Sequence, residues 1–313
     1  MDEFALIRQH FAGLTQACEG VVLGIGDDAA LLAVPMGHEL VVSTDTLVAG
    51  RHFPVNTAPF DVGWKALAVN LSDLAAMGAT PRWFTLALTL PTPDAEWLSE
   101  LARGLKALAD AERVALVGGD TTRGPLALTL TVMGLVPSGQ ALRRDGARTG
   151  DVIAVTGTLG DAALALRQLD QPGADTALRG RLDRPTPRCA AGQALRGLAT
   201  AALDVSDGLA GDLNHILTAS GVGAELVAEQ LPRSAAFQAQ APQDALALQL
   251  HGGDDYELCV CLPPQHLAEA RGRLAALGLP LTATGTITAT PGLFLRQDGV
   301  VRPLPPTGYK HFA

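Results

Sequence analysis

The chain has 313 residues, of which 48% are hydrophobic and 18% are charged. This apolar content excludes a globally disordered chain, and the length suits two domains of roughly 150 residues each. With 23 basic and 32 acidic residues the net charge is 23 − 32 = −9. Because such a protein repels nucleic acid and anionic lipid at long range, we expect neither as a partner.

The cysteines and the first residues indicate a reducing compartment. Cys18, Cys189, Cys259 and Cys261 make neither a disulfide framework nor a zinc spacing, and Cys-x-Cys in ELCVCL predicts two thiols on one face of a strand. MDEFALIRQHF lacks the basic-then-apolar order of a secretion signal. No apolar run approaches the roughly 20 residues that span a bilayer. We therefore expect a soluble cytoplasmic protein.

Apolar spacing predicts alternating helices and strands in the first half of the chain. The expected elements are a helix over 4–17, a strand over 39–48 that breaks at Ser43, Thr44 and Asp45, a helix over 62–77, a strand over 83–90, a helix with Thr92 at its N-cap and Pro93 in its first turn, and strands in VALVGGD and LALTLTVMGLV.

A polar, glycine-bearing segment at 143–151, RRDGARTGD, predicts a domain boundary, with one domain over 1–148 and a second over 149–313. The second half begins with a strand in VIAVTG and a helix from Asp161. It continues with a polar segment at 170–188, strands in ALDV and ELCVCL, and a helix over 265–277. The order predicts a mixed α/β fold of the α+β type with two layers.

Aspartates recur where apolar runs meet Gly, Ser or Thr. The six instances are GIGDDAA at 24–30, STDT at 43–46, NLSD at 70–73, GGDTT at 118–122, DVSDG at 204–208 and GGDDYE at 252–257. Each alone fits a turn or a helix cap. If each instance ends a strand of a sheet, several carboxylates lie close together, where they repel one another unless cations intervene.

The composition favours magnesium as that cation. The chain has only three lysines, Lys65, Lys106 and Lys310, and oxygen ligands suit Mg²⁺, whereas no His/Cys cluster suits zinc. Several Mg²⁺ ions would let an acidic protein bind a polyanion, which indicates phosphoryl transfer, with Arg143 and Arg144 as added positive charge. A P-loop is absent, and the Gly24-x-Gly26-x-x-Ala29 match to a dinucleotide fingerprint is weak, since Asp27 and Asp28 stand where a pyrophosphate would bind. A nicotinamide dehydrogenase is the poor alternative from another class.

Seven motifs in this order resemble the thiamine-monophosphate kinase family, almost from end to end. They are GIGDDAALL, STDTLVAGRHF, KALAVNLSDLAAMGA, GGDTTRGPL, RRDGARTGD, DVSDGL and GGDDYEL. The family belongs to the ATP-binding group of aminoimidazole ribonucleotide synthetase and selenophosphate synthetase. The resemblance implies a two-domain fold of that group, a homodimer through the N-terminal sheets, and transfer of the γ-phosphate of ATP to thiamine phosphate, giving thiamine diphosphate.

The resemblance also implies site residues, position by position. The magnesium ligands fall on Asp28, Ser43, Thr44, Asp45, Asp73, Asp120, Asp204 and Asp207, with Asp27 adjacent. ATP contacts fall on Gly119, Asp120, Arg144 and Ser206. Substrate contacts fall on His52, Asp254 and Tyr309. The family commonly has Glu at the position of Asp254, so Glu257 is an alternative substrate contact. We assign no general base, because the acceptor phosphate oxygen is already ionised near neutral pH.

Two other functions fit this fold group. Selenophosphate synthetase needs a reactive Cys near a Lys, and Cys18 has no lysine near it in the sequence. A non-catalytic nucleotide-binding protein would not need the full set of acids. Incubation with ATP, Mg²⁺ and thiamine phosphate distinguishes these alternatives from the kinase.

Overall fold

A computed structural model describes residues 7–11, 14, 18–25, 27–169, 171, 175–240 and 242–309. The chain divides into two compact units. The N-terminal unit comprises residues 1–74 and 79–139, and the C-terminal unit comprises 75–78 and 140–313. The domain boundary between residues 148 and 149 stays a prediction, and it falls a short way beyond this division.

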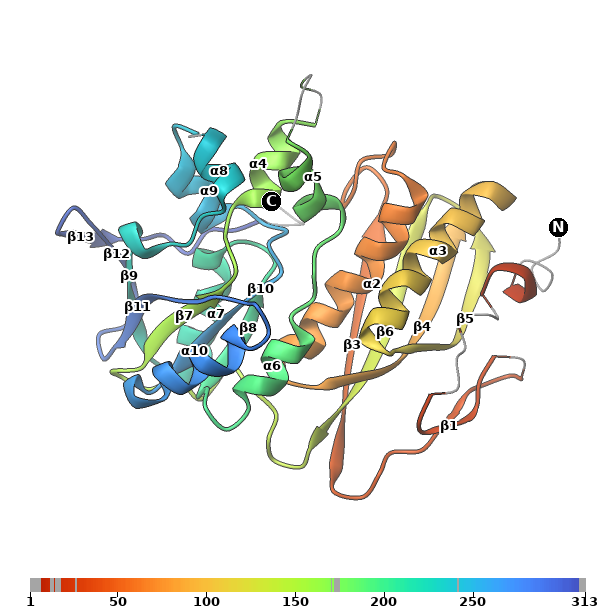
Figure 1. The fold of residues 1–313 in the computed structure, drawn as a ribbon, viewed down its shortest axis with the longest axis horizontal. Coiled ribbons are helices and arrows are strands. Elements are labelled where there is room, and N and C mark those ends of the chain that lie inside the picture. Colours follow the sequence, from red (N-terminus) through yellow and green to blue (C-terminus); the bar gives the residue numbers. More distant parts are fainter. Residues whose placement is uncertain are drawn as a thin grey trace. The chain divides into compact units, whose positions relative to one another are not determined.

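The N-terminal unit is built on a four-stranded sheet with two long helices on one face (Figure 1). The strands, in their order across the sheet, are β3 His38–Val48, β6 Ala127–Pro137, β4 Thr80–Leu90 and β5 Ala115–Arg123. The helices are α2 Pro59–Ala76 and α3 Ala95–Glu112. Strand β4 runs parallel to β5, and α3 makes the connection between them. A long crossover of this kind is what a parallel strand pair requires.

Two glycines allow the two helices to pack closely. A Cβ atom on Gly63 would lie 2.2 Å from the Leu101 carbonyl oxygen, and one on Gly104 would lie 1.9 Å from that of Phe60. No other residue fits at such approaches. Asp94 accepts hydrogen bonds from the N–H groups of Glu96 and Trp97 and is the N-cap of α3. The prediction of Thr92 as this cap was therefore wrong by two residues.

The other face of this sheet is largely uncovered at β3. Along that strand Leu40, Val42, Thr44, Thr46 and Val48 are exposed, as the two-residue period of a strand requires. The short strands β1 Val21–Leu23 and β2 Leu31–Leu32 form a hairpin. Their residues Val21 and Leu32 pack with Cys18 and Ala30 against the buried Trp83. The hairpin thus covers the sheet near Trp83 and leaves the β3 side exposed.

A seven-stranded sheet forms the C-terminal unit, in the order β13-β12-β9-β11-β7-β10-β8. The strands are β7 Val152–Thr156, β8 Ala201–Val205, β9 Gly223–Val227, β10 Glu257–Leu262, β11 Leu281–Thr288, β12 Gly292–Gln297 and β13 Val300–Pro303. The helices are α4 Asp161–Arg167, α5 Thr176–Asp183, α6 Cys189–Leu195, α7 Leu209–Ser220, α8 Ala235–Gln240, α9 Ala245–His251 and α10 Leu267–Ala275, with 3₁₀ turns η3 Ala228–Gln230 and η4 Pro264–His266.

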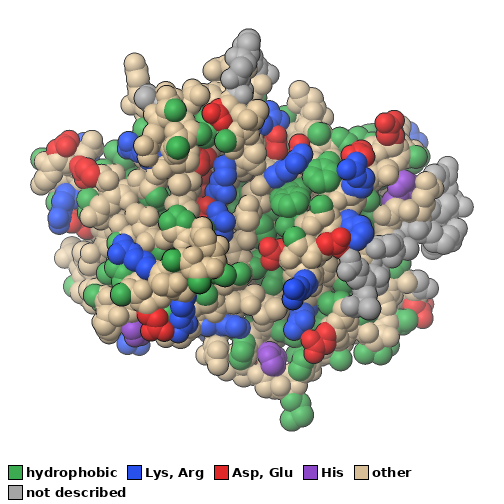
Figure 2. All heavy atoms as spheres, viewed as in Figure 1, with side chains coloured by type: hydrophobic (Ala, Val, Ile, Leu, Met, Phe, Trp, Pro, Cys, Tyr) green, Lys and Arg blue, Asp and Glu red, His purple; other side chains and the backbone are tan. Residues whose placement is uncertain are grey.

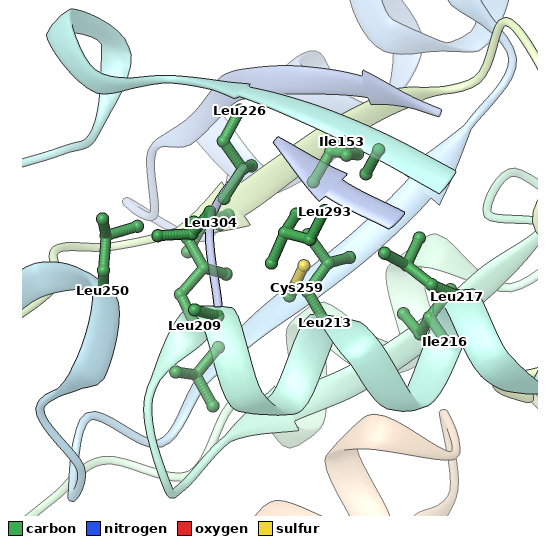
Figure 3. Packing of buried hydrophobic residues seen from close by; sticks show 14 of the residues in the cluster. Ile153, Leu209, Leu213, Ile216, Leu217, Leu226, Leu250, Cys259, Leu293 and Leu304 are labelled. Carbon is green, nitrogen blue, oxygen red and sulfur yellow. The ribbon is translucent and has the colours of Figure 1, made fainter. Parts of the chain in front are cut away.

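Helix α7 buries its apolar side against this sheet (Figure 3). Leu209, Leu213, Ile216 and Leu217 pack there in one cluster with residues of six strands, Cys259 and Cys261 among them. The two thiols therefore lie on one face of β10, as the Cys-x-Cys spacing predicts. Burial raises the pKa of the Cys259 thiol to about 12, with a smaller contribution from the Asp212 carboxylate. Both cysteines act as core residues in the neutral form.

Most predicted elements are confirmed, and the mixed α/β class is confirmed with them. Within the helix predicted over 4–17, the described residues form a π-helical turn over Ile7–Phe11, whereas Phe4 lies outside the described residues. Basic and acidic side chains are interspersed on the face shown in Figure 2. Among the described residues, no helix combines the length and the apolar character needed to cross a bilayer.

Candidate functional site

In the N-terminal unit, two side-chain bridges connect β3 to α2. The Ser43 hydroxyl donates to the Asp73 carboxylate at 2.5 Å, and the Asp45 main-chain N–H donates to the Asn70 side-chain oxygen at 3.0 Å. Asn70 is fully buried, and its amide nitrogen donates to the Ala66 carbonyl at 2.9 Å. Asn70 and Asp73 share a face of α2, because residues three apart on a helix are neighbours. The bridges bring Ser43, Asp45 and Asp73 together at the edge of the sheet.

Thr44 faces the other side of the sheet. Its hydroxyl lies 2.9 Å from that of Thr131 on β6, in a direct cross-strand pair. Strand β3 also continues to Val48, so the prediction that it breaks at Ser43, Thr44 and Asp45 was wrong. Since successive residues of a strand alternate between faces, the Thr44 hydroxyl is separated from the side chains of Ser43 and Asp45.

Asp120 lies far from Asp45 within the same sheet. Asp120 pairs with Ala87 on β4, and Ala87 pairs with Thr129 on β6. Because directly paired residues point to the same face, Asp120 lies on the face of the sheet that α2 and α3 do not cover. Strands β5 and β3 are the two edges of the sheet, three strand spacings apart, or about 14 Å. A Cβ atom on Gly119 would lie 2.0 Å from the Leu86 carbonyl oxygen, so a glycine is required beside Asp120. Within one chain, Asp45 and Asp120 therefore lie on opposite edges and on opposite faces of the sheet.

Asp28 and His52 lie in connecting segments of this unit. Both Asp27 and Asp28 are exposed in the segment between β1 and β2, where the Asp28 N–H donates to the Asp27 carboxylate at 2.8 Å. After β3, the Val48 N–H donates to Nδ1 of His52 at 2.9 Å. Because Nδ1 accepts a hydrogen bond, the neutral ring carries its hydrogen on Nε2. His52 can therefore donate a hydrogen bond from Nε2.

In the C-terminal unit, Asp212 organises the loop that follows β8. Its Oδ2 atom accepts hydrogen bonds from the N–H groups of Ser206 at 3.0 Å, Asp207 at 3.0 Å and Gly208 at 3.1 Å. Burial raises the pKa of Asp212 to about 6, while these N–H groups lower it. The sequence prediction did not include Asp212. The signal for it was an acid in the first turn of the helix after DVSDG, where carboxylates bind main-chain N–H groups.

The GGDDYE segment lies against this loop. The Asp254 N–H donates to the Ser206 carbonyl at 2.8 Å, and the Tyr256 N–H donates to that of Val205 at 2.8 Å. Asp254 and Tyr256 have positive φ angles of 68° and 50°. Such conformations cost roughly 1–3 kcal/mol each and persist where surrounding contacts fix them. The Asp255 carboxylate, which is buried, accepts from the Gly160 N–H at 3.0 Å and supplies a further anchor.

Glu257 is part of the interior of the C-terminal unit. It is 0% exposed. Its carboxylate accepts two hydrogen bonds from Arg188, at 2.7 and 2.5 Å, one from Arg181 at 2.7 Å and one from the Thr156 hydroxyl at 2.7 Å. Since these groups occupy both carboxylate oxygens, they disfavour Glu257 as the substrate contact. Asp254 remains the candidate, and it is partly exposed.

The last described residues meet the same loop. The Tyr309 N–H donates to the Asp207 carbonyl at 3.1 Å, and Tyr309 is 44% exposed. Upstream, Nδ1 of His251 lies 2.9 Å from the Thr307 carbonyl oxygen. Four predicted site residues, Ser206, Asp207, Asp254 and Tyr309, are thus joined by main-chain hydrogen bonds. The fifth, Asp204, is buried in β8, paired with Leu258.

The two arginines at the predicted domain boundary differ from each other. Arg143 donates to the Asp145 carboxylate at 2.9 and 2.7 Å, and this contact raises the pKa of Arg143 and lowers that of Asp145. Arg144 has an exposed side chain, and its carbonyl accepts from the Ser220 hydroxyl at 2.9 Å. Of the two, Arg144 is the better candidate for an anionic ligand.

The premise that all six acidic motifs end strands was wrong in most cases. DVSDG spans the end of β8, and GIGDDAA follows directly after the end of β1. NLSD lies within α2, STDT and GGDTT lie inside β3 and β5, and GGDDYE precedes β10. Helix α2 places Asp73 near β3 by packing on the sheet. The alternation of side chains along β3 and β5 decides the faces of the sheet to which the acids of STDT and GGDTT point.

The donor set suits magnesium. In the part of the chain that the structure describes, no group of three His, Cys, Asp or Glu side chains converges on one point. Mg²⁺ is commonly held by one or two carboxylates, with water and substrate phosphate in the remaining positions. Asp45, Asp73 and the Ser43 hydroxyl provide such a set of oxygen atoms.

Comparisons with known proteins identify relatives along the full chain. Residues 26–136 match the model of the AIR synthase related protein N-terminal domain, and residues 148–298 match that of its C-terminal domain. The chain is 48% identical to a thiamine-monophosphate kinase of Escherichia coli strain K12 over 99% of this chain and 98% of that one.

Solved structures agree with these matches. A crystal structure of thiamine-monophosphate kinase from Stenotrophomonas maltophilia K279a matches with a TM-score of 0.88 and 50% identity, over 96% of this chain and 97% of that one. AaThiL, solved in complex with AMPPCP and TMP, matches with a TM-score of 0.79 and 32% identity, over 92% of each chain. The similarity therefore covers both units.

Proposed function

The chain belongs to the thiamine-monophosphate kinase family, and we propose that it transfers the γ-phosphate of ATP to thiamine phosphate, giving thiamine diphosphate and ADP. The observation that carries the proposal is the end-to-end similarity to kinases of this family, one of which binds AMPPCP, an ATP analogue, together with TMP. ATP is the phosphate donor and a co-substrate.

The C-terminal unit supplies a prearranged surface for the acceptor. Asp254 offers a negative charge that complements the cationic thiazolium ring, and the exposed Tyr309 offers an aromatic face for the same cation. Both residues are held by main-chain hydrogen bonds to the loop that contains Ser206 and Asp207. We assign His52 to the acceptor phosphate, because its Nε2–H can donate a hydrogen bond.

The donor contacts follow from the same chemistry. Gly118 and Gly119 leave the β5 backbone bare, so that a phosphate can approach closely. The exposed Arg144 guanidinium can make two parallel hydrogen bonds to a phosphate, and Ser206 lies on the acceptor loop. No general base is required, because the attacking oxygen belongs to a phosphate that is already ionised near neutral pH.

We assign Mg²⁺ to Asp28, Ser43, Thr44, Asp45, Asp73, Asp120, Asp204 and Asp207. When bound, Mg²⁺ neutralises the charge that spreads over the phosphoryl oxygens during transfer. The chain itself aligns the carboxylates through the Ser43–Asp73 and Asp45–Asn70 contacts. For Thr44 the proposal involves its main-chain oxygen, since its hydroxyl faces β6.

We further propose a homodimer through the N-terminal sheets, in which Asp120 of one chain completes the ligand set of Asp45 in the other. Two observations support it. Within one sheet the two aspartates are about 14 Å apart and on opposite faces, too far to share an ion. The edge strand β3 also exposes Val42 at 54% and Leu40 at 43%, an apolar edge that a second copy would cover.

We propose that the protein resides in a reducing cytoplasm, because none of its four cysteines forms a disulfide in the structure. Purified protein incubated with ATP, Mg²⁺ and thiamine phosphate should form thiamine diphosphate and ADP in equal amounts, as chromatography would measure. Formation of neither product, with ATP unchanged, would favour a non-catalytic nucleotide-binding protein. Thiamine diphosphate formation that does not require ATP would also refute the proposal.

A further inference from the structure

Asp254 has a side-chain partner two residues along the chain. The Tyr256 hydroxyl donates a hydrogen bond to Oδ1 of Asp254 at 3.0 Å. Both side chains are partly buried. Tyr256 thus contacts the one acidic side chain of GGDDYE that we assign to the substrate, and the proposed function does not use it.

This contact is set by the backbone and not by two mobile surface side chains. The positive φ angles of both residues turn the chain sharply on each side of Asp255. The Asp254 and Tyr256 N–H groups are bonded to the carbonyls of Ser206 and Val205, and the Asp255 carboxylate accepts from the Gly160 N–H. Three anchors therefore fix the segment that brings the tyrosine hydroxyl to the aspartate.

The hydrogen bond has a direct chemical consequence. A hydroxyl that donates to Oδ1 restricts the side-chain torsion of Asp254 and so sets the direction of its carboxylate. An aspartate is one methylene shorter than a glutamate, so its reach to a ligand depends more strongly on the direction in which the carboxylate is held. A cationic heterocycle would be recognised by that oriented charge.

We propose that Tyr256 is a positioning residue for the acceptor, which orients the Asp254 carboxylate toward the cationic ring of thiamine phosphate. This inference rests on the proposed function. It assigns Tyr256 a role in acceptor affinity and none in the binding of ATP or in the transfer step.

The test is Tyr256→Phe, which removes the hydroxyl and keeps the ring. The KM for thiamine phosphate should rise about fivefold to tenfold, the size expected for losing one typical hydrogen bond. The kcat and the KM for ATP should stay within about twofold of wild type, because uniform acceptor binding is lost without a change in the transition state. A merely structural role would change all three constants or lower the melting temperature.

The control is the same substitution in an Asp254→Asn background. There Tyr256→Phe should add less than about twofold to the KM for thiamine phosphate, because the charge that it orients is already absent. An unchanged KM in Tyr256→Phe, or an equal rise in both backgrounds, would overturn the proposal.

Wild-type turnover in the same assay separates this proposal from the proposed function. If wild type formed no thiamine diphosphate, calorimetric titration with thiamine phosphate would replace KM by Kd for the same four proteins. If Tyr256→Phe raised the Kd more in the wild-type background than in the Asp254→Asn background, the role of Tyr256 would be supported for a binding protein. No binding by wild type would overturn both proposals.

Discussion

The two units present their acidic residues in opposite ways. In the C-terminal unit, Ser206, Asp207, Asp254 and Tyr309 are joined by main-chain hydrogen bonds, and Asp212 holds three N–H groups of the same loop. In the N-terminal unit, Asp45 and Asp120 are exposed on opposite edges of one sheet, and Asp28 is exposed between β1 and β2.

This difference indicates a division of labour. The C-terminal loops are tied to one another by main-chain hydrogen bonds, so they suit recognition of an organic acceptor. The N-terminal acids Asp28, Asp45 and Asp120 are exposed and spread over a surface, and in the site that we propose they would come together only with cations, a polyphosphate and a second copy. We therefore expect substitution of the proposed ion ligands to affect turnover, and substitution of Asp212, which holds the C-terminal loop, to affect folding.

The largest effect is expected from Asp45→Asn, which removes one charge from the proposed ion site and keeps the shape. We expect kcat to fall about a thousandfold, comparable to losing a main electrostatic contact of a transition state. Asp207→Asn should have a similar effect. Steady-state kinetics over a range of Mg²⁺ concentrations measures it, with circular dichroism to check the fold.

Matched controls for these variants lie on exposed helices and loops. Asp110→Asn removes a carboxylate that pairs with Lys106 in the N-terminal unit, and Asp244→Asn removes one that pairs with Arg167 in the C-terminal unit. Neither should change kcat by more than about twofold, since exposed ion pairs contribute little. Wild-type rates and wild-type Mg²⁺ dependence in Asp45→Asn would refute the ion-site assignment.

The second prediction tests whether the N-terminal site requires two copies. Asp45→Asn and Asp120→Asn chains, each inactive alone, are unfolded together and refolded as a mixture. In half of the dimers the chains differ, and one of the two sites then has both aspartates, so activity should reach about a quarter of wild type.

Refolding each variant separately is the control and should restore nothing. If Asp45 and Asp120 act within one chain, every site in the mixture lacks one of them, and the mixture stays as inactive as its components. That result would remove Asp120 of the second copy from the proposed site.

The third prediction concerns stability and contrasts the two units directly. Asp212→Ala leaves three loop N–H groups without their acceptor, and we expect the free energy of unfolding to fall by about 2 kcal/mol or more. Asp45→Ala removes an exposed carboxylate and should leave it within about 0.5 kcal/mol. Urea unfolding followed by fluorescence measures both; equal losses would contradict the division of labour.

The smallest effect is expected in thiol reactivity. Burial raises the pKa of Cys259 to about 12 and that of Cys261 well above its usual value, and Cys189 is also buried. At pH 8 the Cys259 and Cys261 thiols are protonated, and all three buried thiols are inaccessible. Cys18, in the N-terminal unit, is partly exposed, although burial raises its pKa as well. Iodoacetamide should therefore add one label to the native chain, slowly and at Cys18, and four after denaturation.

Local patterns in the sequence were sufficient for much of the fold. The strand and helix periods identified β4, β6, α2 and the helix from Asp161, and the Cys-x-Cys spacing identified the buried face of β10. The sequence did not decide between Thr92 and Asp94 as the N-cap of α3, because both residue types suit that position. In the structure Asp94 accepts the hydrogen bonds. Strand β3 passes through Ser43, Thr44 and Asp45 because pairing with β6 outweighs the weak strand propensity of Asp45.

For the site, the sequence was informative about residue type and not about position in space. Motif resemblance identified Asp207, Asp254 and Tyr309, which lie together in the structure. It could not separate Glu257 from Asp254, because only the fold brings Arg181 and Arg188 to Glu257. Nor could it place Asp45 and Asp120 on opposite edges, since strand order depends on long-range pairing.

The most direct test of the whole account is a crystal structure with Mn²⁺ in place of Mg²⁺, AMPPCP and thiamine phosphate, because the anomalous signal of manganese locates each ion. The account predicts ions between the nucleotide phosphates and the carboxylates of Asp45 and Asp73, with Asp120 of a second copy at the same ions. Nucleotide bound with no ion at these carboxylates, or with the carboxylates directed away from it, would contradict the account.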